Sequence, residues 1–93
     1  MSETVEREFS IHNELGLHAR PAGQFVAMAS RFTSEISVGR GEEWVDGRSV
    51  LSLLSLAAVT GSSLRIRATG ADAVEAVEAL GDLLESAEQP SKP

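Results

Sequence analysis

The feature that most constrains the fold is the way the spacing of apolar residues changes along the chain. Alternating apolar and polar residues, typical of strands, occupy residues 5–11, 34–38, 43–45 and 63–68. Apolar residues at the three- and four-residue spacing of helices occupy residues 19–31, 49–56 and 72–84. The order is therefore βαββαβα. It predicts an α+β fold, an open-faced β-sandwich in which three helices cover one face of a four-stranded antiparallel sheet.

Composition limits what such a chain does. Its 93 residues suffice for one small domain, expected over residues 1–88, with residues 89–93 as a frayed tail. A net charge of −6 argues against a nucleic-acid partner. No cysteine is present, and no spacing typical of metal ligands occurs. No apolar run resembles a signal peptide or a membrane span, so we expect a cytoplasmic protein without membrane insertion.

The segment from Asn13 to Ala22 contains the residues best suited to chemistry. Pro21 fits the first position of a helix, which places His18 and Arg20 at its N-terminus. Free amides, the helix dipole and the Arg20 guanidinium favour an anion there, and a phosphoryl group is the natural candidate. Three interpretations of His18 stay open: a structural or solvated side chain, a ligand of a bound anion, or a covalent phosphoryl acceptor.

The expected core follows from the same spacing. The residues predicted to point inward are Phe9, Ile11, Ala22, Phe25, Val26, Ala29, Phe32, Ile36, Val38, Leu64, Ile66, Ala68, Ala73, Val74, Val77, Leu80 and Leu84. Gly39–Gly41 is the expected hairpin turn, and Trp44 is expected to serve in packing or as a cover of the hairpin, not in stacking on a ligand. Asp72 is expected to cap the last helix with Glu75 in its first turn. Gly81 costs helix stability, which a close approach to a strand would explain.

Residues 49–56 form a segment too apolar for a fully solvated helix and too short for a membrane span. A domain of this size offers few elements to enclose it, so an exposed apolar patch that includes Leu51 is expected. Ser49 stands where a helix N-cap is expected. Ala27 and Met28 on the first helix are also apolar at outward positions, either as ordinary exposed residues or as part of a docking surface.

Two segments together resemble a known family. Gly16-Leu17-His18-Ala19-Arg20-Pro21-Ala22 is similar to the active-site segment of HPr, the histidine-containing phosphocarrier of the bacterial phosphoenolpyruvate-dependent phosphotransferase system. Val45-Asp46-Gly47-Arg48-Ser49-Val50-Leu51 is similar to the segment that carries the regulatory serine of this family. The resemblance extends from about Val5 to Leu84.

The resemblance implies a phosphocarrier, not an enzyme, that needs no cofactor and acts as a monomer. His18 would accept the phosphoryl group of enzyme I at Nδ1 and pass it to sugar-specific enzyme IIA (EIIA) domains or equivalent acceptors. Arg20 would pair with the phosphoryl oxygens, and the amides of Ala19 and Arg20 would point toward them.

The resemblance also implies a partner-binding surface and a regulatory site. The docking residues would be Gln24, Ala27, Met28, Val50, Leu51 and Leu54, with Leu53 and Leu56 in the core. Ser49 would be the target of an HPr kinase/phosphorylase. Its phosphorylation would add negative charge at the edge of the apolar patch and weaken docking.

Two other functions are compatible with the residues. One is a regulatory phosphoprotein that uses the same surface without sugar transport, for instance in a nitrogen-related branch of the system. The other is a small hydrolase with His18 as base or nucleophile. The hydrolase is disfavoured because the sequence offers neither an enclosed pocket nor a second catalytic group placed with His18.

Overall fold

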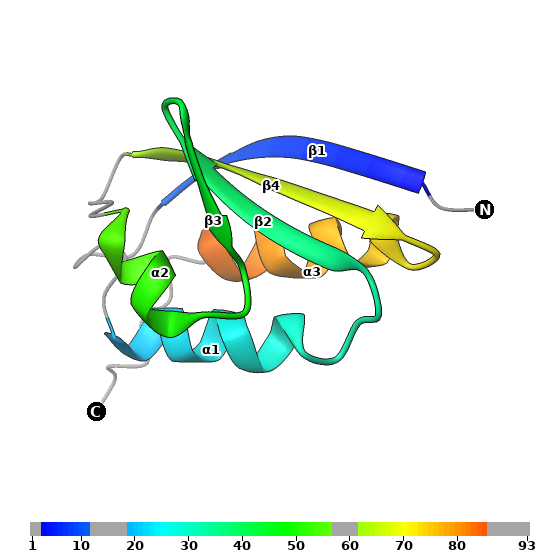
Figure 1. Cartoon of the computed structure of the whole chain (residues 1–93), viewed down its shortest axis with the longest axis horizontal. Helices are drawn as coiled ribbons and strands as arrows, with labels where there is room; N and C mark the ends of the chain where they lie inside the picture. Colours follow the sequence, from blue (N-terminus) through cyan, green and yellow to red (C-terminus); the bar gives the residue numbers. More distant parts are fainter. Residues whose placement is uncertain (1–2, 12–18, 57–61, 86–93) are drawn as a thin grey trace.

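The computed structural model describes residues 3–11, 19–56 and 62–85. Four strands and three helices follow one another as predicted (Figure 1). Their bounds are β1 Glu3–Ser10, α1 Ala19–Ala29, β2 Glu35–Arg40, β3 Glu43–Asp46, α2 Val50–Ser55, β4 Ser63–Gly70 and α3 Ala73–Glu85. The predicted loop at residues 12–16, the turn at Thr60–Gly61 and the tail lie outside the described residues.

The sheet has the strand order β1-β4-β2-β3, and every neighbouring pair is antiparallel. β1 pairs with β4 along its whole length, from Glu3 opposite Gly70 to Ser10 opposite Ser63. The three helices lie on one side of this sheet (Figure 1). The predicted open-faced sandwich is confirmed.

The core lies between the sheet and the helices, and most of its predicted members are buried. They include Phe25 of α1, Leu64 and Ile66 of β4, and Leu80 of α3. Val26 and Phe32 are only partly buried. Val74 is wrongly predicted, because its side chain is 42% exposed while Ala76 is fully buried. The three- and four-residue spacing of the buried face runs through positions 73, 76, 77, 80 and 84, and Val74 falls beside it.

The predicted reason for Gly81 is confirmed. A Cβ atom on this residue would overlap the ring of Phe9, so α3 approaches β1 more closely than any other residue would allow. The ring of Phe9 is 6% exposed, and its burial against α3 offsets the cost in helix stability of a glycine at this position.

Two predicted boundaries shift. α1 ends at Ala29 instead of Arg31, because the amides of Arg31 and Phe32 bind carbonyls three residues back and tighten the chain into a turn. Gly39 and Arg40 belong to β2, and the hairpin turns at Gly41, whose φ is +63°. Gly39 is paired with Trp44 of β3, and a glycine is needed there because a Cβ would lie 2.8 Å from the indole of Trp44.

Polar side chains lie on the open face of the sheet. Trp44 covers the hairpin, and the guanidinium carbons of Arg65 and Arg67 lie 4.6 and 3.9 Å from its ring centroid. Arg67 also pairs with Glu6 at 3.3 Å, and Arg65 donates to the carbonyl of Gly41. The Glu6–Arg67 pair is 41% exposed on both sides and therefore adds little stability.

Asp72 precedes α3 as predicted, but its carboxylate binds a different segment. It accepts hydrogen bonds from the backbone N–H of Thr33 at 2.9 Å, from the N–H of Ser34 at 3.0 Å, and from the Ser34 hydroxyl at 2.6 Å. Gly70 permits this contact, because its φ is +153° and a Cβ there would lie 2.6 Å from Ser34 Oγ. The bond from the Ser34 hydroxyl and then that from Thr33 lower the pKa of Asp72 below its ordinary value.

This pKa direction predicts how stability depends on pH. A carboxylate with a depressed pKa in the folded state stabilises the fold above its unfolded pKa and loses that contribution as the pH falls through the folded value. Asp72→Asn should therefore lower the Tm between about pH 7 and about pH 5, and the difference from the native chain should shrink below about pH 4.

Thermal unfolding across this pH range checks the prediction, with Asp82→Asn on the exposed side of α3 as the control. The control should leave the Tm nearly unchanged. A Tm difference for Asp72→Asn that persists undiminished at low pH would show that the charge of Asp72 is not responsible.

Candidate functional site

The first turn of α1 is the part of the predicted phosphoryl site that the structure describes. Arg20 is the second residue of this helix, and its side chain is exposed. His18 lies outside the described residues, as does the side chain of Ala19. The turn contains no acidic residue, so no carboxylate of this turn competes with a bound anion for its amides.

Pro21 is the third helical residue and not the first, as its fit to the first position suggested, because α1 begins at Ala19. The first four N–H groups of a helix have no intrahelical acceptor, so a proline at this position removes no hydrogen bond. The amides of Ala19 and Arg20 remain in this turn as the donors that an anion would require.

The predicted docking residues divide between two helices that contact one another. On α1, Gln24 and Ala27 are exposed and Met28 is partly buried. On α2, Leu51 is 80% exposed, whereas Val50 and Leu54 are partly buried against the core. Leu53 and Leu56 are buried, as expected.

These two helices differ in charge from the rest of the chain. Neither α1 nor α2 contains an acidic residue, and Arg20 is the one charged residue within them. The carboxylates of the described residues lie on the strands, the connecting segments and α3 instead. A chain with a net charge of −6 thus carries no carboxylate on these two helices. We refer to Gln24, Ala27, Met28, Val50, Leu51 and Leu54 as the α1/α2 surface.

Ser49 is the N-cap of α2. Its backbone is extended, with φ −121° and ψ 114°, and its Oγ accepts a hydrogen bond from the N–H of Ser52 at 3.2 Å. The side chain is partly buried next to Val50 and Leu51, at the edge of the α1/α2 surface. The predicted capping role is confirmed, and phosphorylation of Ser49 stays a prediction.

Arg48 makes long-range contacts that the sequence analysis did not predict. Its Nη2 donates to three backbone carbonyls at the end of α1 and beyond it: Ala29 at 3.3 Å, Phe32 at 2.6 Å and Ser34 at 3.0 Å. Its own backbone N–H donates to Asp46 Oδ1 at 2.9 Å. An arginine directly before an expected N-cap was the available signal, but its carbonyl partners are distant in sequence.

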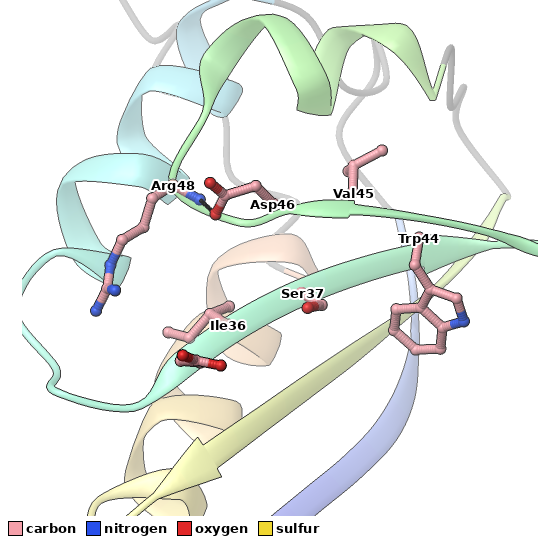
Figure 2. Close-up of a pocket in the computed structure, with 7 residues that line it drawn as sticks. Ile36, Ser37, Trp44, Val45, Asp46 and Arg48 are labelled. Atoms are coloured by element: carbon pink, nitrogen blue, oxygen red, sulfur yellow. Dashed lines mark hydrogen bonds between the residues drawn. The ribbon is translucent and has the colours of Figure 1, made fainter.

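A cleft of about 530 Å³ lies beside the β2–β3 hairpin (Figure 2). It is lined by Glu35, Ile36, Ser37, Trp44, Val45, Asp46 and Arg48, and no residue of the first turn of α1 reaches it. It is therefore separate from the predicted phosphoryl site.

Neither a metal site nor a membrane span is found in the part of the chain that the structure describes. Within residues 3–11, 19–56 and 62–85, His, Cys, Asp and Glu side chains nowhere gather in threes to hold a metal ion. Among the same residues, no helix combines the length and apolar character needed to cross a membrane.

Comparison with known proteins decides the family. The family described as "PTS HPr component phosphorylation site" matches residues 5–86. The chain belongs to the HPr family. Its sequence is 40% identical over 80 residues to the phosphocarrier protein HPr of Neisseria meningitidis serogroup A, which covers 86% of this chain and 90% of that protein.

Solved structures agree with this membership. HPr of Bacillus anthracis superposes with a TM-score of 0.85 at 36% identity, covering 88% of this chain and 98% of that one. HPr of Thermoanaerobacter tengcongensis gives a TM-score of 0.84 at 41% identity, covering 88% and 92%. The chain is thus a phosphocarrier of the phosphotransferase system, not an enzyme. The resemblance seen in the sequence is confirmed.

Proposed function

We propose that this chain relays a phosphoryl group in the cytoplasm from enzyme I to sugar-specific enzyme IIA domains or equivalent acceptors, with His18 as the temporary acceptor. The observation that supports the proposal most strongly is the family match over residues 5–86, which includes the segment around His18. Phosphotransfer partners follow from membership of the family, whereas the identity of donor and acceptors is part of the proposal.

The transfer requires a neutral imidazole. Nδ1 of His18 attacks the phosphorus atom carried by the phosphohistidine of enzyme I, so one N–P bond forms as the other breaks and the donor nitrogen leaves with the electron pair. The positive end of the α1 dipole disfavours protonation of the ring. The Arg20 side chain and the amides of Ala19 and Arg20 balance the charge of the phosphoryl oxygens.

Release to the next protein limits how tightly the phosphoryl group is bound. A site that held it with many buried donors would lower the free energy of the phosphorylated state and slow the second transfer. The exposure of Arg20 is consistent with moderate binding, because an exposed guanidinium contributes less than a buried one.

Docking would depend on the α1/α2 surface. Leu51 is 80% exposed, and burying such a side chain contributes about 1.5–3 kcal/mol. The absence of carboxylates from α1 and α2 avoids repulsion of an acidic or phosphorylated partner, despite the net charge of −6. We propose that one such monomer meets its donor and its acceptors in turn on this surface.

The proposal is tested by phosphorylation with labelled phosphoenolpyruvate and enzyme I. The native chain should take up label that is acid-labile and base-stable, and His18→Ala should take up none. His12→Ala, which removes the other histidine, is the matched control and should keep the label. Label that survives in His18→Ala, or a native chain that takes up none, would contradict the proposal.

Ser49 is the proposed regulatory site, phosphorylated by an HPr kinase/phosphorylase. A negative charge there borders Val50 and Leu51 and must lose water when a partner docks. Ser49→Asp should lower the rate of His18 phosphorylation by enzyme I about tenfold, which corresponds to about 1.4 kcal/mol. Thr4→Asp, which places the same charge on the exposed strand β1, should leave the rate unchanged. Equal rates for both variants would count against regulation at Ser49.

A further inference from the structure

The position of α2 depends on contacts at its ends. The helix has six residues and contains a single fully buried side chain, that of Leu53. A helix of this length is not stable alone in water, so the tertiary contacts around it must hold it in place. Its C-terminal end is bound by Arg40, whose Nη1 donates to the carbonyl of Leu56 at 2.8 Å.

Arg48 performs the corresponding role at the N-terminal end. It directly precedes Ser49, the N-cap of α2, while its Nη2 binds the carbonyls of Ala29, Phe32 and Ser34. Figure 2 shows its side chain extending from the segment before α2 alongside α1, away from Asp46. One side chain therefore connects the start of α2 to the end of α1.

A guanidinium suits this connection. The carbonyl of Ala29 lies at the end of α1 and carries the negative end of the helix dipole, which a cation complements, and the carbonyls of Phe32 and Ser34 belong to the segment that follows. Arginine presents several N–H groups in a fixed plane, whereas lysine presents a point charge on a shorter chain. All three carbonyls lie 2.6 to 3.3 Å from Nη2 and share its two hydrogens, so this one nitrogen joins three positions of the backbone.

We propose that Arg48 is a positioning residue for phosphoryl transfer. It fixes α2, and with it Leu51, relative to the helix that begins beside His18. The inference rests on the proposed function, because a donor that docks on the α1/α2 surface must contact both helices while its phosphorus atom faces the acceptor nitrogen. Errors of about 1 Å in such an arrangement reduce transfer strongly. Losing the connection would weaken docking and leave the reactivity of the imidazole unchanged.

The test compares Arg48→Gln with Arg31→Gln, which removes the same charge from the exposed turn just after α1. With enzyme I and phosphoenolpyruvate, the KM for Arg48→Gln should rise about tenfold while kcat stays within about twofold, and Arg31→Gln should match the native chain. Phosphorylation by phosphoramidate, a small donor that needs no docking, should proceed at the same rate in all three proteins.

Hydrogen exchange separates positioning from direct contact with the partner. In free Arg48→Gln, the amides of Ser52 and Leu53, which bind Ser49, should exchange faster than in the native chain and in Arg31→Gln. A raised KM without faster exchange would mean that Arg48 touches the partner directly, and faster exchange without a raised KM would mean that its role is structural only. Either result overturns the proposal.

Arg48→Lys keeps the charge and serves where Arg48→Gln fails to fold. Its KM for enzyme I should lie between those of the native chain and Arg48→Gln, and so should the exchange rates of the Ser52 and Leu53 amides. An intermediate value for only one of these two quantities overturns the proposal. A native chain that accepts no phosphoryl group from enzyme I overturns the proposed function. A native chain that accepts it, with an unchanged KM in the Arg48 variants, overturns the role of Arg48 alone.

Discussion

The turn between α1 and β2 is the point on which the described structure depends, because two side chains of opposite charge bind its backbone. The guanidinium of Arg48 donates to the backbone carbonyls of Ala29, Phe32 and Ser34. Asp72 accepts from the amides of Thr33 and Ser34. The polar backbone groups of a partly buried turn require such partners, and each comes from a distant part of the chain. The turn thereby joins α1 to the start of α2 and to the start of α3.

The two sides of the molecule differ in what their side chains contact. On the sheet side, the indole of Trp44 lies against the guanidinium groups of Arg65 and Arg67, and Arg67 also pairs with Glu6. On the other side, Leu51 of α2 stays exposed, and α1 and α2 contain no acidic residue. An exposed apolar side chain such as Leu51 is typical of an interaction surface, and a domain of this size has few elements to cover it. The residues that hold the sheet side together are therefore different from those exposed on α1 and α2.

The sequence predicted those parts of the molecule that depend on local spacing. Period-two and helical patterns located all seven elements, and Gly81 predicted a close approach of the last helix to a strand, which the structure shows to be β1. The identity of Ser49 as an N-cap followed from the same local chemistry.

Long-range contacts were less accessible to prediction. Asp72 was expected to cap its own helix, whereas it binds Thr33 and Ser34, 39 and 38 residues away. Arg48 gave no periodic signal, since its partners are carbonyls whose position depends on where α1 ends. Val74 was misplaced because valine was weighed by its hydrophobicity, while Ala76 occupies the buried face. The roles of His18 and Arg20 came from the resemblance to HPr, and the chemistry of the residues alone left three interpretations of His18 open.

The central claim is that α1 and α2 form one docking surface beside the phosphoryl acceptor. Amide chemical shifts of the isotopically labelled chain, titrated with unlabelled enzyme I, test it most directly. Changes should concentrate on α1 and α2, including Gln24, Ala27 and Leu51, and leave the open face of the sheet unaffected. Changes centred on Trp44 and Arg65 of that face, with α1 and α2 unperturbed, would contradict the claim.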